Sequence, residues 1–226
     1  YYVLDVDPEL VKRCALEILP PTPGPAPVRD YGPEEPLAPA RREITQRMEV
    51  SMPMFALGFK LPYLPEGQER LRQELLGDLA GELLCGESSP LYQKLYEEGL
   101  IDAGFGVSYE QLKGMPNLTF SGDSDDPGAV MEAILAEAGR VVTEGVDEAL
   151  FGRLRRASLG SRIRGLDGFD GMCYRLALGC FDGYDYFRFP EHYETMTGED
   201  LRQFIRDHVT REQAVLSVIS PLGREE

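Results

Sequence analysis

The sequence predicts an α+β fold in which helices cover one face of a mostly antiparallel sheet. Three observations support this fold class. Runs of strand-forming residues open and close the larger part of the chain, amphipathic helical patterns lie between them, and the order is strand, strand, helix, helix, strand, strand, helices, strand. A chain of 226 residues is long enough to bury one sizeable core.

The composition excludes several classes of partner. The chain is 42% hydrophobic and 27% charged, as in ordinary globular proteins, and its net charge is −16. Phosphate binding needs clustered Lys and Arg, so the acidic balance argues against nucleic acid and against an anionic membrane surface. No run of about 18 apolar residues occurs, and we therefore expect no membrane span.

The N-terminal residues read as the middle of a longer protein. The chain starts without an initiator Met or a signal-peptide pattern, at a predicted strand over residues 1–6. Asp7 and Pro8 then supply a helix cap and a first-turn proline, and apolar spacing carries the helix to about Leu19. We interpret residues 1–19 as the tail end of a preceding domain.

The next twenty residues, 20–39, predict a linker. Eight of them are proline, which removes backbone donors and favours stiff, extended structure. A proline-rich recognition motif is the alternative to a spacer. Residues 40–226 then form the main domain.

The domain is expected to begin with strands over 43–50 and 54–61, separated by a turn at 51–53. Leucines at helical spacing predict a helix over 66–84, and Ser89 followed by Pro90 starts the next one.

Further along, residues 101–109 and 118–122 are β-compatible and could pair as antiparallel strands around 113–117. The remaining predicted elements are helices that start at Pro127 and span 147–164, 171–180 and 198–208, and a last strand over 213–219.

The four cysteines, Cys14, Cys85, Cys173 and Cys180, form no C-x-x-C pair. Cys173 and Cys180 lie seven apart, on one face of a helix, so a disulfide is the alternative to free thiols. Buried free thiols fit a reducing compartment, and we predict a cytoplasmic location.

The segment Leu84–Leu100, LCGESSPLYQKLYEEGL, resembles the C-terminal-half signature of the M16 (pitrilysin-type) zinc metallopeptidases. That signature combines a glycine, a Ser-Ser pair, Leu-Tyr or Leu-Phe, and a Leu-Arg-Glu-Glu-Gly-Leu stretch. Residues 5–9, 59–62 and 121–127 are similar to further pieces of the family in the same order. Bacterial members associated with elongation factor P modification are the most similar.

The resemblance implies a LuxS/MPP-like fold, of which this chain would be the non-catalytic C-terminal half. It also implies a catalytic N-terminal half, in the same polypeptide or in a paired subunit, with which this half encloses a peptide substrate. Zinc is expected only in that other half, where two histidines and a glutamate of an H-x-x-E-H motif would bind the metal and activate water.

No zinc cofactor is expected in this chain. Its only histidines, His192 and His208, lie sixteen residues apart and neither belongs to an H-x-x-E-H motif. Two imidazoles on separate elements could still meet in space, but a lone histidine is more often structural. Hydrolysis by that chemistry is therefore not predicted for these residues.

The resemblance also implies substrate-binding residues. The family's C-terminal half supplies an Arg and a Tyr that stabilise the oxyanion, and these positions fall on Tyr96 and Asp102. Neither residue type is retained, and Tyr109 is a candidate substitute. The alternative function is a relic domain that acts as a binding or assembly module without proteolysis.

Three more patterns have competing interpretations. Five arginines over 153–164 predict a solvated helix face, or else a docking surface for an acidic partner. Aspartates over 123–126 predict a helix cap rather than a cation loop. The aromatic stretch over 181–193 predicts a cap on the core, with a peptide-contacting wall as the alternative.

Overall fold

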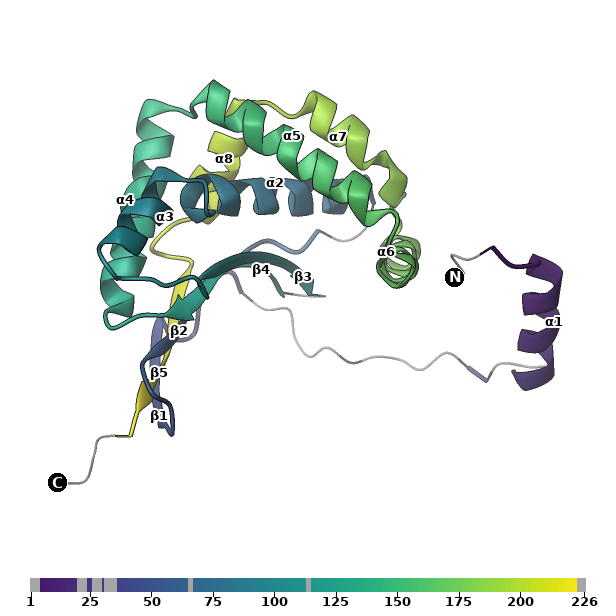
Figure 1. The fold of residues 1–226 in the computed structure, drawn as a ribbon, viewed down its shortest axis with the longest axis horizontal. Coiled ribbons are helices and arrows are strands. Elements are labelled where there is room, and N and C mark those ends of the chain that lie inside the picture. Colours follow the sequence, from purple (N-terminus) through teal and green to yellow (C-terminus); the bar gives the residue numbers. More distant parts are fainter. Residues whose placement is uncertain are drawn as a thin grey trace.

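The structure is a computed structural model that describes residues 5–19, 24–25, 30, 36–64, 67–112 and 115–222. Most of the predicted linker and residues 1–4 of the predicted first strand lie outside these ranges. Asp5 and Val6 are not in a strand, so that part of the prediction is wrong. Helix α1 (Pro8–Ile18) is confirmed, with the Asp7 carboxylate accepting the Glu9 N–H at 3.0 Å. It lies apart from the domain in Figure 1.

One five-stranded sheet organises the domain. Its strands are β1 (Glu43–Met48), β2 (Met54–Lys60), β3 (Gly106–Leu112), β4 (Met115–Asp123) and β5 (Ala214–Pro221). Their spatial order is β1-β5-β2-β4-β3, and every pair is antiparallel except β1 with β5. The mostly antiparallel sheet is thus confirmed. The last strand of the chain inserts between the first two, so β1 and β2 are not neighbours.

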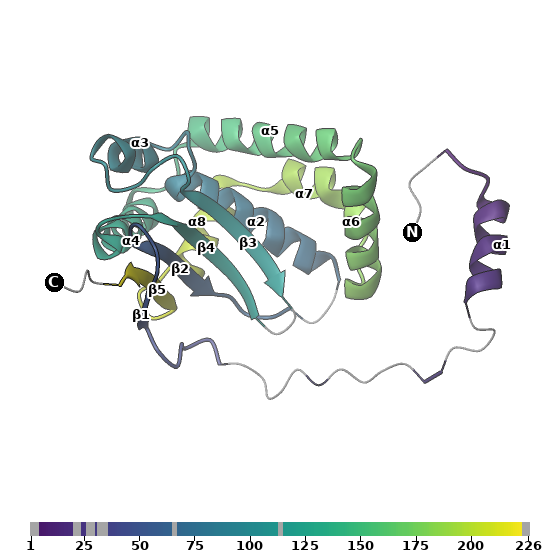
Figure 2. The ribbon, with the colours of Figure 1, turned by 60° about the horizontal axis from the view of Figure 1, so that its bottom comes forward.

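Helices cover the sheet on one face, in two layers (Figures 1 and 2). Helix α2 lies on β3 and β4, and other helices pack on its outer side. The helices of the domain are α2 (Gln68–Cys85), α3 (Pro90–Glu97), α4 (Pro127–Glu144), α5 (Glu148–Gly165), α6 (Phe169–Asp182), α7 (Phe189–Thr195) and α8 (Gly198–His208). The single turn η1 (Tyr186–Arg188) precedes α7.

Side-chain caps fix where several of these helices begin. The Ser89 hydroxyl accepts the Tyr92 N–H at 3.1 Å, and the Asp126 and Asp147 carboxylates accept backbone N–H groups of α4 and α5. The acidic turn before α4 therefore acts as a helix cap, as predicted. Each such bond satisfies a donor that the helix leaves unpaired.

The core lies between the sheet and α2. Alternate residues of β2 and β4 point to this side, and Phe59 meets Phe120 edge to face with ring centroids 6.0 Å apart. Leucines of α2 close the layer from above, at positions 71, 75 and 79, all fully buried. The leucine spacing in the sequence predicted this buried face.

The hairpin of β3 and β4 is confirmed, but its boundaries are not those predicted. Residues 101–105 form a turn, in which Asp102 accepts the Gly104 N–H at 2.7 Å and its carbonyl accepts the Phe105 N–H at 3.2 Å. The strand therefore starts at Gly106. At the other end, Met115 to Asn117 already pair with β3, so the connection is shorter than predicted.

The aromatic stretch caps the core only in part. Tyr186, Phe189 and Tyr193 are buried, whereas Phe181 and Phe187 are exposed. Helix α7, which positions two of these rings, was not predicted. Its Pro190 sits in the first turn, where proline is tolerated.

None of the four cysteines, all within the described ranges, forms a disulfide, as predicted, but only Cys85 is buried; Cys173 is half-buried and Cys14 and Cys180 are exposed. The expectation that all four thiols are buried is thus wrong. In the part of the chain that the structure describes, no helix combines the length and apolar character needed to cross a bilayer.

Candidate functional site

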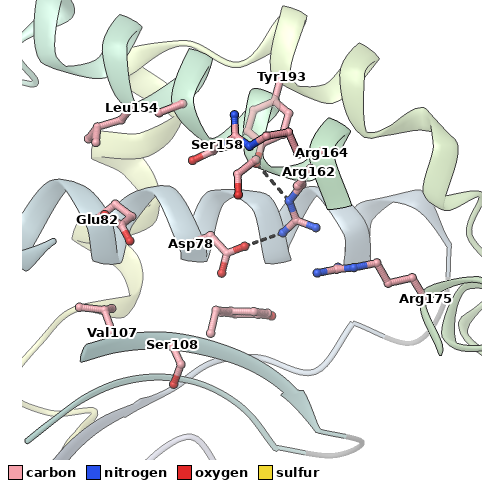
Figure 3. Close-up of a pocket in the computed structure, with 13 residues that line it drawn as sticks. Asp78, Glu82, Val107, Ser108, Leu154, Ser158, Arg162, Arg164, Arg175 and Tyr193 are labelled. Carbon is pink, nitrogen blue, oxygen red and sulfur yellow. Dashed lines mark hydrogen bonds and ion pairs between the residues drawn. The ribbon is translucent and has the colours of Figure 1, made fainter. Parts of the chain in front are cut away.

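A polar cavity of about 460 Å³ opens beside β3, the strand at one edge of the sheet. Helix α2 forms its floor, β3 one side and α5 the other, with α6 and α7 at one end (Figure 3). It is lined by Asp78, Glu82, Val107, Ser108, Tyr109, Leu154, Ala157, Ser158, Ser161, Arg162, Arg164, Arg175 and Tyr193.

Two glycines of α2 allow β3 to lie against the helix. A Cβ added at Gly77 would come within 2.3 Å of the Tyr109 ring, and one at Gly81 within 2.3 Å of Val107 Cγ1. Real side chains do not approach so closely, so any larger residue would push β3 away. The cavity wall on the β3 side therefore depends on these two glycines.

An ion-pair network centred on Arg162 holds α5 to α2. Its Nη2 donates to Glu74 at 2.9 Å and to Asp78 at 2.5 Å, and its Nε donates to the Tyr193 hydroxyl at 3.2 Å. The Arg162 side chain is only 9% exposed. The predicted solvated face is therefore wrong for Arg162, because two carboxylates one helical turn apart on α2 compensate its charge.

The other arginines of this run behave differently. Arg153, Arg156 and Arg164 are exposed, in agreement with a solvated face. Arg155 is half-buried and donates to the Met196 carbonyl at 3.0 Å. One run of like charges thus serves two purposes, according to which side of α5 each residue occupies.

The network shifts the titration of its acids and bases. Burial raises the pKa of Asp78 to about 6, outweighing the attraction of Arg162, and the neighbouring Glu74 charge adds to the rise. For Arg162, burial disfavours the charge, but Glu74 and Asp78 outweigh it and raise the pKa above its usual value. Arg162 is consequently a permanent cation, and Asp78 can change its charge near neutral pH.

The predicted residue Tyr109 lies in this cavity. Its hydroxyl donates to Gln73 Oε1 at 3.1 Å, and the Gln73 amide donates to the Pro62 carbonyl at 3.2 Å. Burial raises the pKa of Tyr109 above its usual range. The hydroxyl is held on α2, and the ring contributes to the cavity wall.

The predicted residues Tyr96 and Asp102 lie together elsewhere, around Tyr92. The Tyr96 ring, 51% exposed, stacks on Tyr92 with centroids 6.1 Å apart, and Asp102 is exposed in the turn before β3. Burial raises the pKa of Tyr92, helped by the charges of Glu87 and Asp102. Tyr92 lines a second cavity of about 400 Å³ that shares Glu82 and Val107 with the first.

The two histidines occupy separate structural positions. His192 Nε2 lies 3.2 Å from Gln68 Oε1, and His208 packs edge to face on Phe204 at 4.9 Å; burial lowers the pKa of both. Among the described residues, no group of three or more His, Cys, Asp or Glu side chains could hold a metal ion. The described residues therefore do not fit a zinc centre.

Residues 5–158 match the sequence model of the family described as the Peptidase M16 inactive domain. This chain belongs to that family. It is 27% identical over 187 residues to YmfH of Bacillus subtilis, which is named a zinc protease; the match covers 80% of this chain but 42% of that protein. The chain therefore spans less than half the length of this curated relative.

Solved structures share the fold. An M16-like peptidase from Alicyclobacillus acidocaldarius is 25% identical, with a TM-score of 0.79 over 84% of this chain and 46% of that one. A protease from Helicobacter pylori matches with a TM-score of 0.78, 16% identity and coverage of 96% and 53%. The inactive peptidase domain of a zinc protease from Bordetella parapertussis matches with a TM-score of 0.64 and 15% identity, over 80% and 97%.

Sequence reasoning missed Glu74, Asp78, Arg162 and Tyr193 as one cluster. A signal was present: two acidic residues four apart on the same helix as Gly77 and Gly81, and an arginine run on another helix. The leucine spacing predicted the apolar face of α2. Nothing in the sequence indicated which arginine would contact Glu74 and Asp78 on the same helix.

Proposed function

We propose that this M16 inactive domain is the substrate-enclosing, non-catalytic half of a zinc peptidase. Its partner would be a catalytic half with an H-x-x-E-H motif, in the same polypeptide or in a paired subunit, and that half would hold the zinc. The bound metal would polarise a water molecule there, and this chain would supply the facing wall of the peptide chamber.

The observation that carries the proposal is the position of β3. It is an edge strand of the sheet, and the polar cavity opens directly beside it. An exposed sheet edge accepts an extended peptide through main-chain hydrogen bonds, while pockets next to the edge receive side chains. A peptide held in this way would be extended before it reached the metal.

Within this proposal Tyr109, Tyr96 and Asp102 are the peptide-contacting residues. Tyr109 would contribute the surface of its ring from the cavity wall. Tyr96 and Asp102 would contact the peptide on the α3 side, where both are exposed. Residues 1–19 would end the preceding domain, residues 20–39 would link it to residues 40–226, and the assembled protein would act in the cytoplasm.

A second candidate function is a relic domain that binds peptides or assembles with a partner without supporting cleavage. The observation in its favour is the carboxylate of Asp102 on this surface. An arginine and a tyrosine stabilise a developing oxyanion, whereas a carboxylate opposes one. Under this alternative the catalytic half would gain nothing from the presence of this chain.

A reconstitution experiment separates the two candidates. Cleavage of a quenched fluorescent peptide is measured with zinc for this chain, for the H-x-x-E-H half and for both together. The proposal predicts turnover only for the combination, abolished by a chelator or by Gln in place of the motif's Glu. A complex that forms without any turnover would support the relic module and reject the proposed function.

A further inference from the structure

We propose that the cavity beside β3 binds a carboxylate group of an extended peptide, with Arg162, Arg164 and Arg175 as its cationic wall. The inference deepens the proposed function and rests on it for the peptide nature of the ligand. The carboxylate could be the C-terminus of the peptide or an Asp or Glu side chain, because the recognition chemistry is the same for both.

The first support is the gathering of positive charge in an acidic protein. The chain has a net charge of −16, yet three guanidinium groups line one cavity, from α5 and α6. The carboxylates around the cavity are Glu74 and Asp78, which both pair with Arg162, and Glu82, so three guanidinium groups face three carboxylates. Glu82 lies one turn further along α2 and also lines the second cavity.

The second support is a donor of Arg162 that the protein does not use. Its Nη1 is buried and has no hydrogen-bond partner among the described residues, although Nε and Nη2 are fully engaged. Buried donors of this kind are nearly always paired with protein, water or ligand. A carboxylate oxygen in the cavity would satisfy this donor and gain a charge-assisted hydrogen bond.

The third support is the availability of the other two guanidinium groups. Arg164 is exposed and forms no ion pair with any residue in the described ranges. Arg175 is 42% exposed, lies 5.1 Å from the centroid of the Tyr186 ring and has its nearest carboxylate, Glu74, at 3.7 Å. Figure 3 shows Arg162 and Arg175 reaching from α5 and α6 to the same end of the cavity, beside Asp78.

The fourth support is the fit between this charge and the sheet edge. Val107 and Tyr109 of β3 face α2, and Ser108 between them points away from α5 in Figure 3, whereas Ser158 and Ser161 line the cavity from α5. A peptide strand on the edge of β3 would place every second side chain toward α5. A carboxylate at that position would meet planar guanidinium groups, which bind carboxylates with two parallel hydrogen bonds.

The test measures peptide binding to the assembled protein, with Gln in place of the Glu of H-x-x-E-H to prevent cleavage. Three ten-residue peptides labelled at the N-terminus are compared by fluorescence anisotropy. The first has a free C-terminal carboxylate, the second a C-terminal amide, and the third an amide plus one internal Glu. Binding of the first alone assigns the site to C-termini, and binding of the third assigns it to acidic side chains.

The variant Arg164→Glu reverses the exposed charge at the cavity, and Arg153→Glu is its matched control on the same helix, away from the cavity. We expect Arg164→Glu to weaken binding of the carboxylate-bearing peptide about tenfold, since it replaces attraction by repulsion, and Arg153→Glu to change it less than about twofold. Ser161→Trp would fill the cavity from an exposed position and should weaken peptide binding as well. It tests the same cavity independently if Arg164→Glu fails to fold.

Equal affinities for all three peptides, or equal effects of Arg164→Glu and Arg153→Glu, would overturn the inference. The proposed function fails separately. If the reconstituted pair cleaves peptides with and without carboxylates equally well, the result supports the proposed chamber wall and rejects the carboxylate site. If the assembled protein binds carboxylate-bearing peptides selectively but the wild-type pair cleaves none of them, the result supports the carboxylate site and rejects the peptidase role.

Discussion

The two edges of the sheet, β1 and β3, differ in what lies behind them. Every residue of β1 is exposed, and the strand extends past the helices beside its single neighbour β5 (Figure 1). Strand β3 instead packs against α2, with Val107 and Tyr109 half-buried. Polar residues such as Arg47 discourage unwanted pairing on β1. The edge at β3 thus has a helix behind it and a cavity beside it, whereas the edge at β1 is exposed along its whole length.

The largest expected loss of stability follows from a substitution on the β3 side of the domain. Arg162→Met would leave Glu74 and Asp78 close together without their shared cation, and should lower the free energy of unfolding by about 3 kcal/mol. Arg153→Met, on the exposed side of the same helix, should change it by less than about 0.5 kcal/mol. Chemical denaturation measures both, and equal losses would show that the Arg162 network does not support the β3 side.

The contact between β3 and α2 gives the next largest effect. Gly77→Ala would drive a methyl group into the Tyr109 ring and should destabilise the domain by about 2 kcal/mol. Gly139→Ala is the matched helical control on α4: a Cβ there meets no atom within 4 Å, so the higher helix propensity of alanine should stabilise by about 0.5 kcal/mol. Thermal unfolding at neutral pH compares them, and a stabilising Gly77→Ala would contradict the packing described here.

The charge of Asp78 predicts a pH dependence of stability. Its pKa is raised from 3.8 to about 6 in the folded protein, so the folded state binds a proton that the unfolded state has already released. This contribution to stability is fully present below about pH 4 and is lost as the pH rises through 6. Wild type should therefore lose stability relative to Asp78→Asn over this interval, by about 1 kcal/mol because the carboxyl is partly exposed.

The free energies of unfolding of the two proteins are measured at pH 4, 5, 6 and 7 in one buffer series. Other carboxylates titrate in the same range, so only the difference between the proteins reports on Asp78. A difference that stays constant across the series would show that Asp78 has an ordinary pKa.

The smallest effect is expected at Tyr96. Its exposed ring stacks on Tyr92, and Tyr96→Ala should cost only about 0.5 kcal/mol. Peptide binding by the assembled protein is the informative measurement, with Tyr174→Ala, another exposed tyrosine, as the control. A loss of peptide affinity confined to Tyr96→Ala would extend the binding surface from β3 to α3, and identical affinities would limit it to the cavity.

Local rules predicted most of the elements. Proline and side-chain caps located the starts of α1, α3 and α4, because each cap depends on residues within three positions of one another. The β-compatible pattern over 101–109 predicted too early a start for β3. The Asp102 carboxylate accepts the Gly104 N–H and forms a local turn, so the residues before Gly106 do not pair with β4.

Long-range contacts could not be predicted in the same way. Which strand lies beside β1, and which arginine meets Glu74 and Asp78, depend on packing between residues 80 or more positions apart. The absence of a zinc-binding motif was readable from two histidines in the sequence. The cavity was not, because it is formed by five elements that only the folded chain brings together.

The most direct test of the chamber wall uses a photo-reactive side chain in the assembled protein, with the Glu of H-x-x-E-H replaced by Gln. One variant carries it at Ser108 on β3, and the control carries it at Gln46 on β1. Irradiation with a labelled peptide should crosslink the peptide to position 108 and not to position 46. Crosslinking at position 46 alone, or at neither position while the peptide remains bound, would contradict the assignment of β3 as the peptide-facing edge.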